Sequence, residues 1–259
     1  MLEFEKKEEH TMIEKFEHYF PLKQTFKQIH VYLPDDYADS EERYPVMYMY
    51  DGHNLFNDHD ATYGTSWGLK DFLEQYDKRL IIVGIECSHN GNERLDEYCP
   101  YPIETSFFGT MNGYGDKLMD WVVHDLKAHI DESYRTYPFR EATAIGGSSM
   151  GGLMAFYSVI AYNSYFSKAA CLSPSISLCL DQLKAEWFHH NISPDTRVYF
   201  SFGEREIAGR EQVLADVGYF NDQLVQQGGT SYIHVQKNGG HNETTWKKQN
   251  QLFMDILWK

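Results

Sequence analysis

A serine stands at the centre of a Gly-x-Ser-x-Gly pattern formed by Gly147, Ser149 and Gly151. The apolar residues 142–145 precede it as a short buried strand would, and residues 153–161 have the length and composition of a helix. A serine on such a strand-to-helix turn is held in a strained conformation that only glycine neighbours permit. The turn also leaves the Met150 N–H free to donate to an anionic oxygen. The pattern therefore predicts a nucleophile at Ser149.

This serine needs a base and an acid, because a hydroxyl is a poor nucleophile near neutral pH unless an imidazole removes its proton. Among the twelve histidines, His241 is the best placed, since it follows the last expected strand and a Gly-Gly pair. The order serine, acid, histidine along the chain is the one that this strand–turn–helix architecture uses. Glu204 and Glu206 both follow a strand, and either carboxylate could accept the second N–H of the histidine.

The elements that must position these residues alternate between strands and helices. A helix is expected at 115–134, and further strands are expected at residues 26–33, 46–50, 80–87, 167–172, 198–202 and 232–235. Repeated alternation of this kind predicts an α/β fold with a mostly parallel central sheet and helices on both faces. Because no linker-like segment divides it, we expect residues 1–259 to form a single domain, with residues 1–20 as a charge-rich N-terminal arm.

Composition narrows the classes of partner. The net charge of −15 argues against nucleic acid and against anionic membrane surfaces, so a small neutral or cationic substrate is expected. The charged first ten residues lack the apolar core of a signal peptide, and no run approaches the length of a membrane span, which predicts a soluble cytoplasmic protein. The composition does not decide whether the protein forms a homo-oligomer.

The cysteines and the acidic loop after residue 50 contain residue types that can bind metals. The four cysteines have no Cys-x-x-Cys spacing, so free thiols are expected. The polar residues of 51–60 match no strong calcium or zinc pattern. The sequence therefore predicts no metal site and no cofactor.

Several motifs together are more specific than the serine pattern alone. They occupy residues 51–56, 94–98, 146–152, 172–175, 203–206 and 239–246. With these motifs the chain resembles, from about residue 26 to its carboxyl end, the esterase D-like branch of the α/β-hydrolases. That branch of esterases includes feruloyl esterases, enterochelin esterases, S-formylglutathione hydrolases and mycolyltransferases. The resemblance implies the α/β-hydrolase fold.

The resemblance also implies roles for individual residues. It implies that Ser149 is the nucleophile and His241 the base, with the acid in the loop after the strand at 198–202. Members of the family place the acid three residues beyond a glycine that corresponds to Gly203, which favours Glu206 over Glu204. The family's second oxyanion donor corresponds to the backbone N–H of His53, beside that of Met150.

A long segment, residues 88–114, is rich in Asn, Gly, Pro and aromatic residues and shows no periodicity. It is expected to form the substrate pocket together with Trp67 and Ser173. Its candidate contacts are Arg94, Tyr98, Tyr101, Phe107 and Phe108. Arg94 could bind a substrate carboxylate or phosphate, or it could form a structural pair with Asp96 or Glu97.

The sequence thus predicts a serine carboxylic ester hydrolase that acts on short acyl or aryl esters through an acyl-enzyme. One alternative is an acyltransferase, which uses the same nucleophile and differs only in whether an alcohol or water accepts the acyl group. Another is a non-catalytic binding protein that retains the hydrolase fold. The intact set of serine, acid and histidine favours an enzyme, and the sequence does not choose between hydrolysis and transfer.

Overall fold

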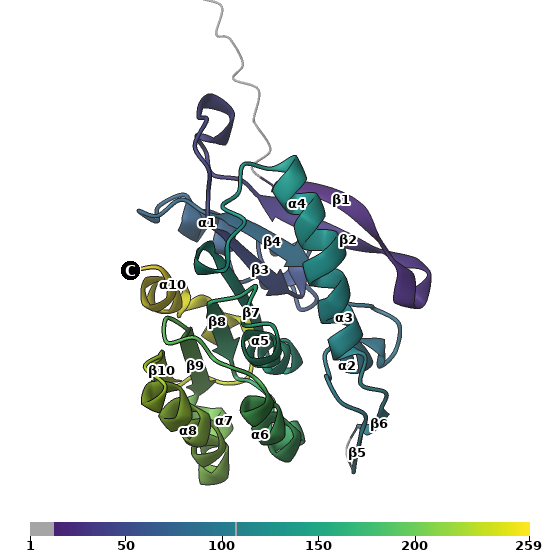
Figure 1. The fold of residues 1–259 in the computed structure, drawn as a ribbon, viewed down its shortest axis with the longest axis vertical. Coiled ribbons are helices and arrows are strands. Elements are labelled where there is room, and N and C mark those ends of the chain that lie inside the picture. The colour runs from purple at the N-terminus through teal and green to yellow at the C-terminus, as the bar shows by residue number, and fades with distance from the viewer. Residues whose placement is uncertain (1–12, 107) are drawn as a thin grey trace, which may run out of the picture.

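The computed structural model describes residues 13–106 and 108–259, and its centre is an eight-stranded sheet (Figure 1). The strand order is β1-β2-β4-β3-β7-β8-β9-β10. The strands are β1 (Ile13–Phe20), β2 (Thr25–Tyr32), β3 (Val46–Tyr50), β4 (Ile81–Ile85), β7 (Thr143–Ser148), β8 (Lys168–Leu172), β9 (Arg197–Gly203) and β10 (Thr230–Gln236). All pairs from β4 to β10 are parallel, whereas β1 and β2 are antiparallel to their neighbours.

The central strands are apolar on both sides because both faces of the sheet are covered. In β3, Tyr48 packs into one buried cluster, while Met47 and Met49 pack into another on the opposite face. The first cluster is covered by α3 (Gly115–Trp121), α4 (Lys127–Ser133), α5 (Met150–Ala161), α6 (Leu180–His189) and α8 (Glu211–Gln226). The second is covered by α1 (Leu69–Leu73), α9 (Glu243–Lys247) and α10 (Asn250–Trp258). The predicted α/β class is confirmed.

The helix expected at 115–134 is present with one irregularity. A π-helical turn, Val122–Leu126, joins α3 to α4. Within the described residues, no helix combines the length and the apolar character that a membrane crossing requires.

The sequence does not fix the structure of the N-terminal arm. Its residues 13–20 form the edge strand β1, which pairs with β2 from Ile13 opposite Tyr32 to Phe20 opposite Thr25. Phe20 is fully buried, and the Trp121 indole N–H donates to the Tyr19 carbonyl at 2.8 Å. Charged residues on this strand discourage pairing with another chain at the exposed edge. Residues 1–12 lie outside the described residues.

The segment 88–114 carries short elements of its own. These are α2 (Glu93–Glu97) and a hairpin of β5 (Ile103–Thr105) and β6 (Gly109–Met111). Phe107 lies outside the described residues. The segment follows β4, so it begins at the carboxyl edge of the parallel strands, where the loops after β3, β7, β9 and β10 also emerge.

Candidate active site

Ser149 lies on a sharp turn between β7 and α5. Its backbone has φ 58° and ψ −119°, a conformation that costs about 1–3 kcal/mol for a non-glycine residue. A Cβ on Gly147 would lie 2.8 Å from the carbonyl carbon of Gly151, so a side chain there would force the turn open. The Ser149 N–H donates to the Leu172 carbonyl at 2.9 Å, which fixes the turn against β8. Met150 is the first residue of α5, so its N–H has no partner within the helix.

His241 and Glu206 form a close pair that lines the same cavities as this serine. Nδ1 of His241 lies 2.6 Å from Oε2 of Glu206, while the other carboxylate oxygen accepts from the Ser173 hydroxyl at 2.7 Å and from the Gly203 N–H at 2.5 Å. Burial raises the pKa of Glu206, but these hydrogen bonds outweigh it and hold the pKa below its ordinary value. The carboxylate is therefore ionised and orients the imidazole through Nδ1.

Two loops must approach closely for this pair to form. A Cβ on Gly203 would lie 2.5 Å from the carbonyl carbon of Gly239, so glycine is required where the loop after β9 meets the loop after β10. The Arg205 N–H donates to the Gly239 carbonyl at 2.9 Å. Glu204 accepts the Asn238 N–H at 2.7 Å and thus holds the loop rather than the histidine. Of the two candidate acids, it is Glu206 that contacts His241.

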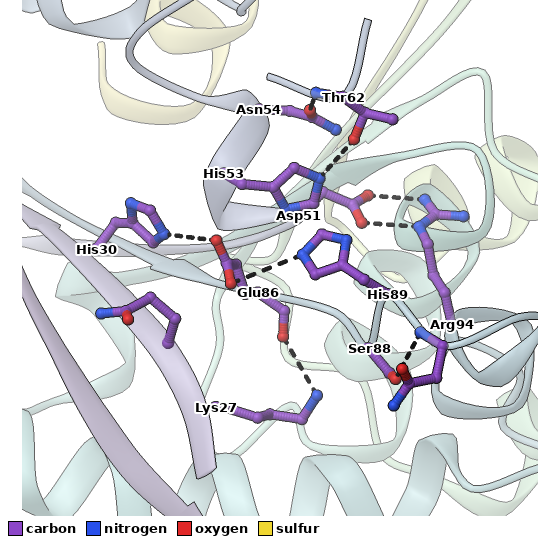
Figure 2. A network of polar contacts seen from close by, with 12 residues as sticks. Lys27, His30, Asp51, His53, Asn54, Thr62, Glu86, Ser88, His89 and Arg94 are labelled. Atoms are coloured by element: carbon purple, nitrogen blue, oxygen red, sulfur yellow. Dashed lines mark hydrogen bonds and ion pairs between the residues drawn. The ribbon is translucent and has the colours of Figure 1, made fainter. Parts of the chain in front are cut away.

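An ion pair between Asp51 and Arg94 joins the loop after β3 to α2 and lines the first of the cavities described below (Figure 2). Nε and Nη2 of Arg94 donate to the two Asp51 carboxylate oxygens, each at 2.7 Å. Burial raises the pKa of Asp51, but Arg94 more than offsets it and leaves the pKa lowered. The Asp51 N–H donates to the Tyr98 hydroxyl at 3.1 Å, and the guanidinium lies over the Tyr98 ring at 5.0 Å. This pairing fixes the loop that carries His53.

His53 belongs to a 3₁₀ turn, Gly52–Asn54, whose first N–H groups have no partner inside the turn. Its side chain is 6% exposed, and Nε2 lies 2.9 Å from the Thr62 hydroxyl. Burial lowers the pKa of His53, so the ring is neutral near pH 7. The backbone N–H is thus available on the same wall as the Asp51–Arg94 pair.

Two cavities meet at Ser149 and His241. The first has a volume of about 480 Å³ and is also lined by Asp51, His53 and Arg94, among others. The second, of about 550 Å³, is lined on its other sides by Phe108, Ser175, Glu206 and two arginines, Arg205 and Arg210. The cavities offer room on both sides of the serine.

Three residues expected to contact substrate are placed elsewhere. Trp67 is 2% exposed and packs against Trp246, and Tyr98 is fully buried against Tyr50. Ser173 is 3% exposed; its hydroxyl donates to Glu206 and accepts from the Trp246 indole at 2.9 Å. These side chains line neither cavity and support the walls from behind, which corrects their assignment as substrate contacts.

The expected partners of Arg94 are also corrected. Asp96 instead accepts two hydrogen bonds from Asn112, one from the backbone N–H at 2.6 Å and one from Nδ2 at 2.9 Å. Glu97 accepts from the Lys27 ammonium and the Ser88 N–H, each at 2.9 Å. Arg94 does line the first cavity, but its guanidinium group donates to Asp51.

Sequence reasoning assigned no role to several residues of the first cavity. Glu243 is 7% exposed there, and burial raises the pKa of its carboxyl group. The signal in the sequence that could have identified Glu243 is its position two residues after His241. Cys87 and His89 also line this cavity, and their place just after β4 was the corresponding signal.

Comparison with known proteins places the chain among esterases. A sequence model of the family described as "Putative esterase" matches residues 24–256. Uncharacterized protein YbbA of Bacillus subtilis (strain 168) is 26% identical over 239 residues, which span 85% of this chain and 87% of that protein. Esterase MT1326 of Mycobacterium tuberculosis (strain CDC 1551 / Oshkosh) is 30% identical over 59% of this chain, and the match covers 30% of that protein.

Solved structures share the fold. An IroE-like serine hydrolase from Shewanella oneidensis has a TM-score of 0.75 at 20% identity, covering 94% of this chain and 80% of that one. The BES protein from Bacillus cereus also has a TM-score of 0.75, at 18% identity, covering 99% of this chain and 98% of that one. The fold is therefore that of the α/β-hydrolases. With a family match over most of its length, the chain belongs to this esterase family and is a carboxylic ester hydrolase.

Proposed function

We propose that the protein hydrolyses short acyl or aryl carboxylic esters through an acyl-enzyme on Ser149. The observation that carries the proposal is the 2.6 Å contact of Glu206 with His241, beside cavities that also reach Ser149 on its strained turn. Glu206 fixes Nδ1 of the ring, which leaves Nε2 to act on the serine hydroxyl.

In the first step the Ser149 oxygen attacks the ester carbonyl carbon as His241 takes its proton. The negative oxygen of the tetrahedral intermediate accepts from the N–H groups of Met150 and His53, and each donor contributes about 3 kcal/mol. Collapse breaks the bond to the alcohol oxygen, which receives the proton from His241. Water then adds to the acyl-serine by the same route, with His241 as base, and releases the acid.

The two cavities give the acyl and alcohol parts separate places. Volumes of about 480 Å³ on one side and about 550 Å³ on the other have room for small acyl and alcohol groups. This supports short esters as the substrate class.

The test is hydrolysis of p-nitrophenyl acetate by the wild type and by Ser149→Ala, with circular dichroism as the check of folding. Loss of the nucleophile should reduce kcat by about 10⁵-fold or more. A fluorophosphonate should label Ser149, as mapped by mass spectrometry. A wild-type rate in Ser149→Ala, or labelling elsewhere, would refute the assignment. Acyl transfer is distinguished by adding an alcohol acceptor and measuring how the product divides between acid and new ester.

A further inference from the structure

His53, Cys87 and His89 form a cluster that lines the first cavity. Each offers one donor atom, and these atoms all lie within 4.8 Å of one another. His53 lies in the loop after β3 and the other two lie just after β4. Because β3 and β4 are parallel neighbours, with Tyr50 opposite Ile85, their carboxyl ends bring the three together. The cluster is thus held by the sheet rather than by a loose surface loop.

The buried His53 ring has one nitrogen without a partner. Nδ1 is buried and makes no hydrogen bond among the described residues, although the side chain is only 6% exposed. Nε2 is held by Thr62 at 2.9 Å, which fixes the ring orientation. The His53 and His89 rings meet edge to face, with centroids 4.7 Å apart (Figure 2). A buried ring nitrogen without a hydrogen-bond partner is unfavourable unless something binds it.

The surrounding groups resemble the supports that orient metal-ligating histidines. An oxygen of Glu86 lies 3.7 Å from Nε2 of His89, and its other oxygen lies 3.1 Å from Nε2 of His30 (Figure 2). In known metal sites a carboxylate that accepts from the second ring nitrogen fixes the ring of a ligating histidine, and Glu86 is the carboxylate beside His89. Burial and the neighbouring Asp51 carboxylate raise the pKa of the Cys87 thiol, and the Arg94 guanidinium opposes this in part, so a metal ion must displace the thiol proton when it binds.

We propose that His53, Cys87 and His89 bind a Zn²⁺ ion, with the fourth coordination position open to the catalytic cavity. Two imidazoles and one thiolate suit zinc rather than magnesium or calcium, which take oxygen ligands. Tetrahedral zinc with bonds of about 2.0–2.3 Å needs donors about 3.5 Å apart, so the cluster must contract slightly. His89 provides that movement, because its side chain is 59% exposed whereas His53 and Cys87 are buried. This site departs from the sequence-based expectation of no metal.

Zinc at this position inhibits ester hydrolysis. This part of the proposal rests on the proposed function. The ion would occupy the cavity that also reaches Ser149, and it would bind the residue whose backbone N–H serves the oxyanion.

The test uses untagged protein freed of metal with a chelator and titrated with Zn²⁺ by calorimetry, in the Ser149→Ala background so that catalysis plays no part. We expect one ion per chain. His89→Ala should weaken binding by at least about 100-fold, since loss of an orienting partner alone costs 10–100-fold, and Thr62→Val should weaken it by about tenfold. His59→Ala is the matched control, because this histidine lies outside the cluster with its side chain 78% exposed.

Cobalt provides a second readout. Co²⁺ bound at the same place should give a thiolate-to-metal charge-transfer band that disappears in Cys87→Ser. Equal zinc affinity in the wild type and His89→Ala, or a band that survives Cys87→Ser, would overturn the metal site. Wild-type protein that binds zinc here but hydrolyses p-nitrophenyl acetate at an unchanged rate would overturn the inhibition alone.

Discussion

Each of the two walls of the cavity at Ser149 carries an acidic side chain with a basic partner, and the two pairs differ in how exposed they are. On the wall made by the loops after β9 and β10, the His241 side chain is 47% exposed, although its partner Glu206 is 9% exposed. On the wall made by the loops after β3 and β4, Asp51 is 7% and Arg94 29% exposed, and the pair is bidentate. In the proposed mechanism the first wall exchanges a proton, which fits an imidazole that reaches the cavity. The second wall is proposed only to fix the backbone donor of His53, which fits an ion pair whose two charges are held together.

The largest expected effect is on the proton-exchanging wall. Glu206→Gln keeps the shape of the side chain but removes the charge that stabilises the imidazolium, so kcat should fall by about 10⁴-fold. Glu204→Gln is the matched control, since Glu204 contacts the Asn238 N–H and not His241. The measurement is p-nitrophenyl acetate kinetics with both variants. A larger loss in Glu204→Gln would transfer the role of the acid to that residue.

On the wall that carries the Asp51–Arg94 pair, the main expected effect is a change in the stability of the fold. Arg94→Met leaves the buried Asp51 carboxylate without its partner, which should lower the free energy of unfolding by about 3 kcal/mol, the lower end of the range for broken buried pairs. Activity should fall by a similar factor for all esters. Urea unfolding and a panel of neutral and anionic esters measure the two effects.

The double variant Asp51→Asn/Arg94→Met tests the cause. It should recover part of the lost stability, because the unpaired charge is then removed. If Arg94→Met selectively raised KM for anionic esters at unchanged stability, Arg94 would be a substrate-binding residue and the contrast between the walls would fail.

A smaller effect is expected where the first wall meets the core. Ser173→Ala removes the hydroxyl that donates to Glu206 and accepts from the Trp246 indole. The buried indole N–H is then unpaired, which should cost about 1–3 kcal/mol of unfolding free energy. Ser175→Ala, two residues further on, is the control and should change little. Unchanged stability in both variants would show that Ser173 does not anchor this wall.

Local patterns predicted the sheet and the residues of the first wall. The turn at Ser149 depends on neighbouring glycines, so its signal is contained within a few residues. From the residues alone, Glu204 and Glu206 were equally suited as the acid, and the preference for Glu206 came from the family resemblance, which places the acid three residues beyond Gly203. His241 follows directly from its place after the last strand. Such features survive in a single sequence because the geometry that they require is local.

Contacts between residues far apart in the chain account for most of the differences between the sequence-based predictions and the structure. For Arg94 the sequence predicts either a substrate anion or a structural pair with its neighbour Asp96 or Glu97, but its partner Asp51 lies 43 positions away in the chain. Tyr98 and Trp67 are predicted as pocket residues because aromatic side chains suit both a pocket and a core. Only the packing shows that they fill the core. The edge strand at 13–20 was missed because its many charges suit a solvated segment as well as an exposed edge.

The smallest expected effect is the acid dependence of stability on the first wall. The pKa of Glu206 is lowered from its ordinary 4.5, so the folded state favours the ionised carboxylate more than the unfolded state does. Its contribution is fully present above the ordinary pKa and is lost as the pH falls from there through the lowered pKa of the folded state. Glu206→Gln cannot titrate, so its melting temperature should decline less steeply than that of the wild type over this acid range. The exposed Glu104→Gln in the β5 strand is the control. Parallel declines in the wild type and Glu206→Gln would mean that the contacts of Glu206 with His241, Ser173 and Gly203 do not favour its ionised form.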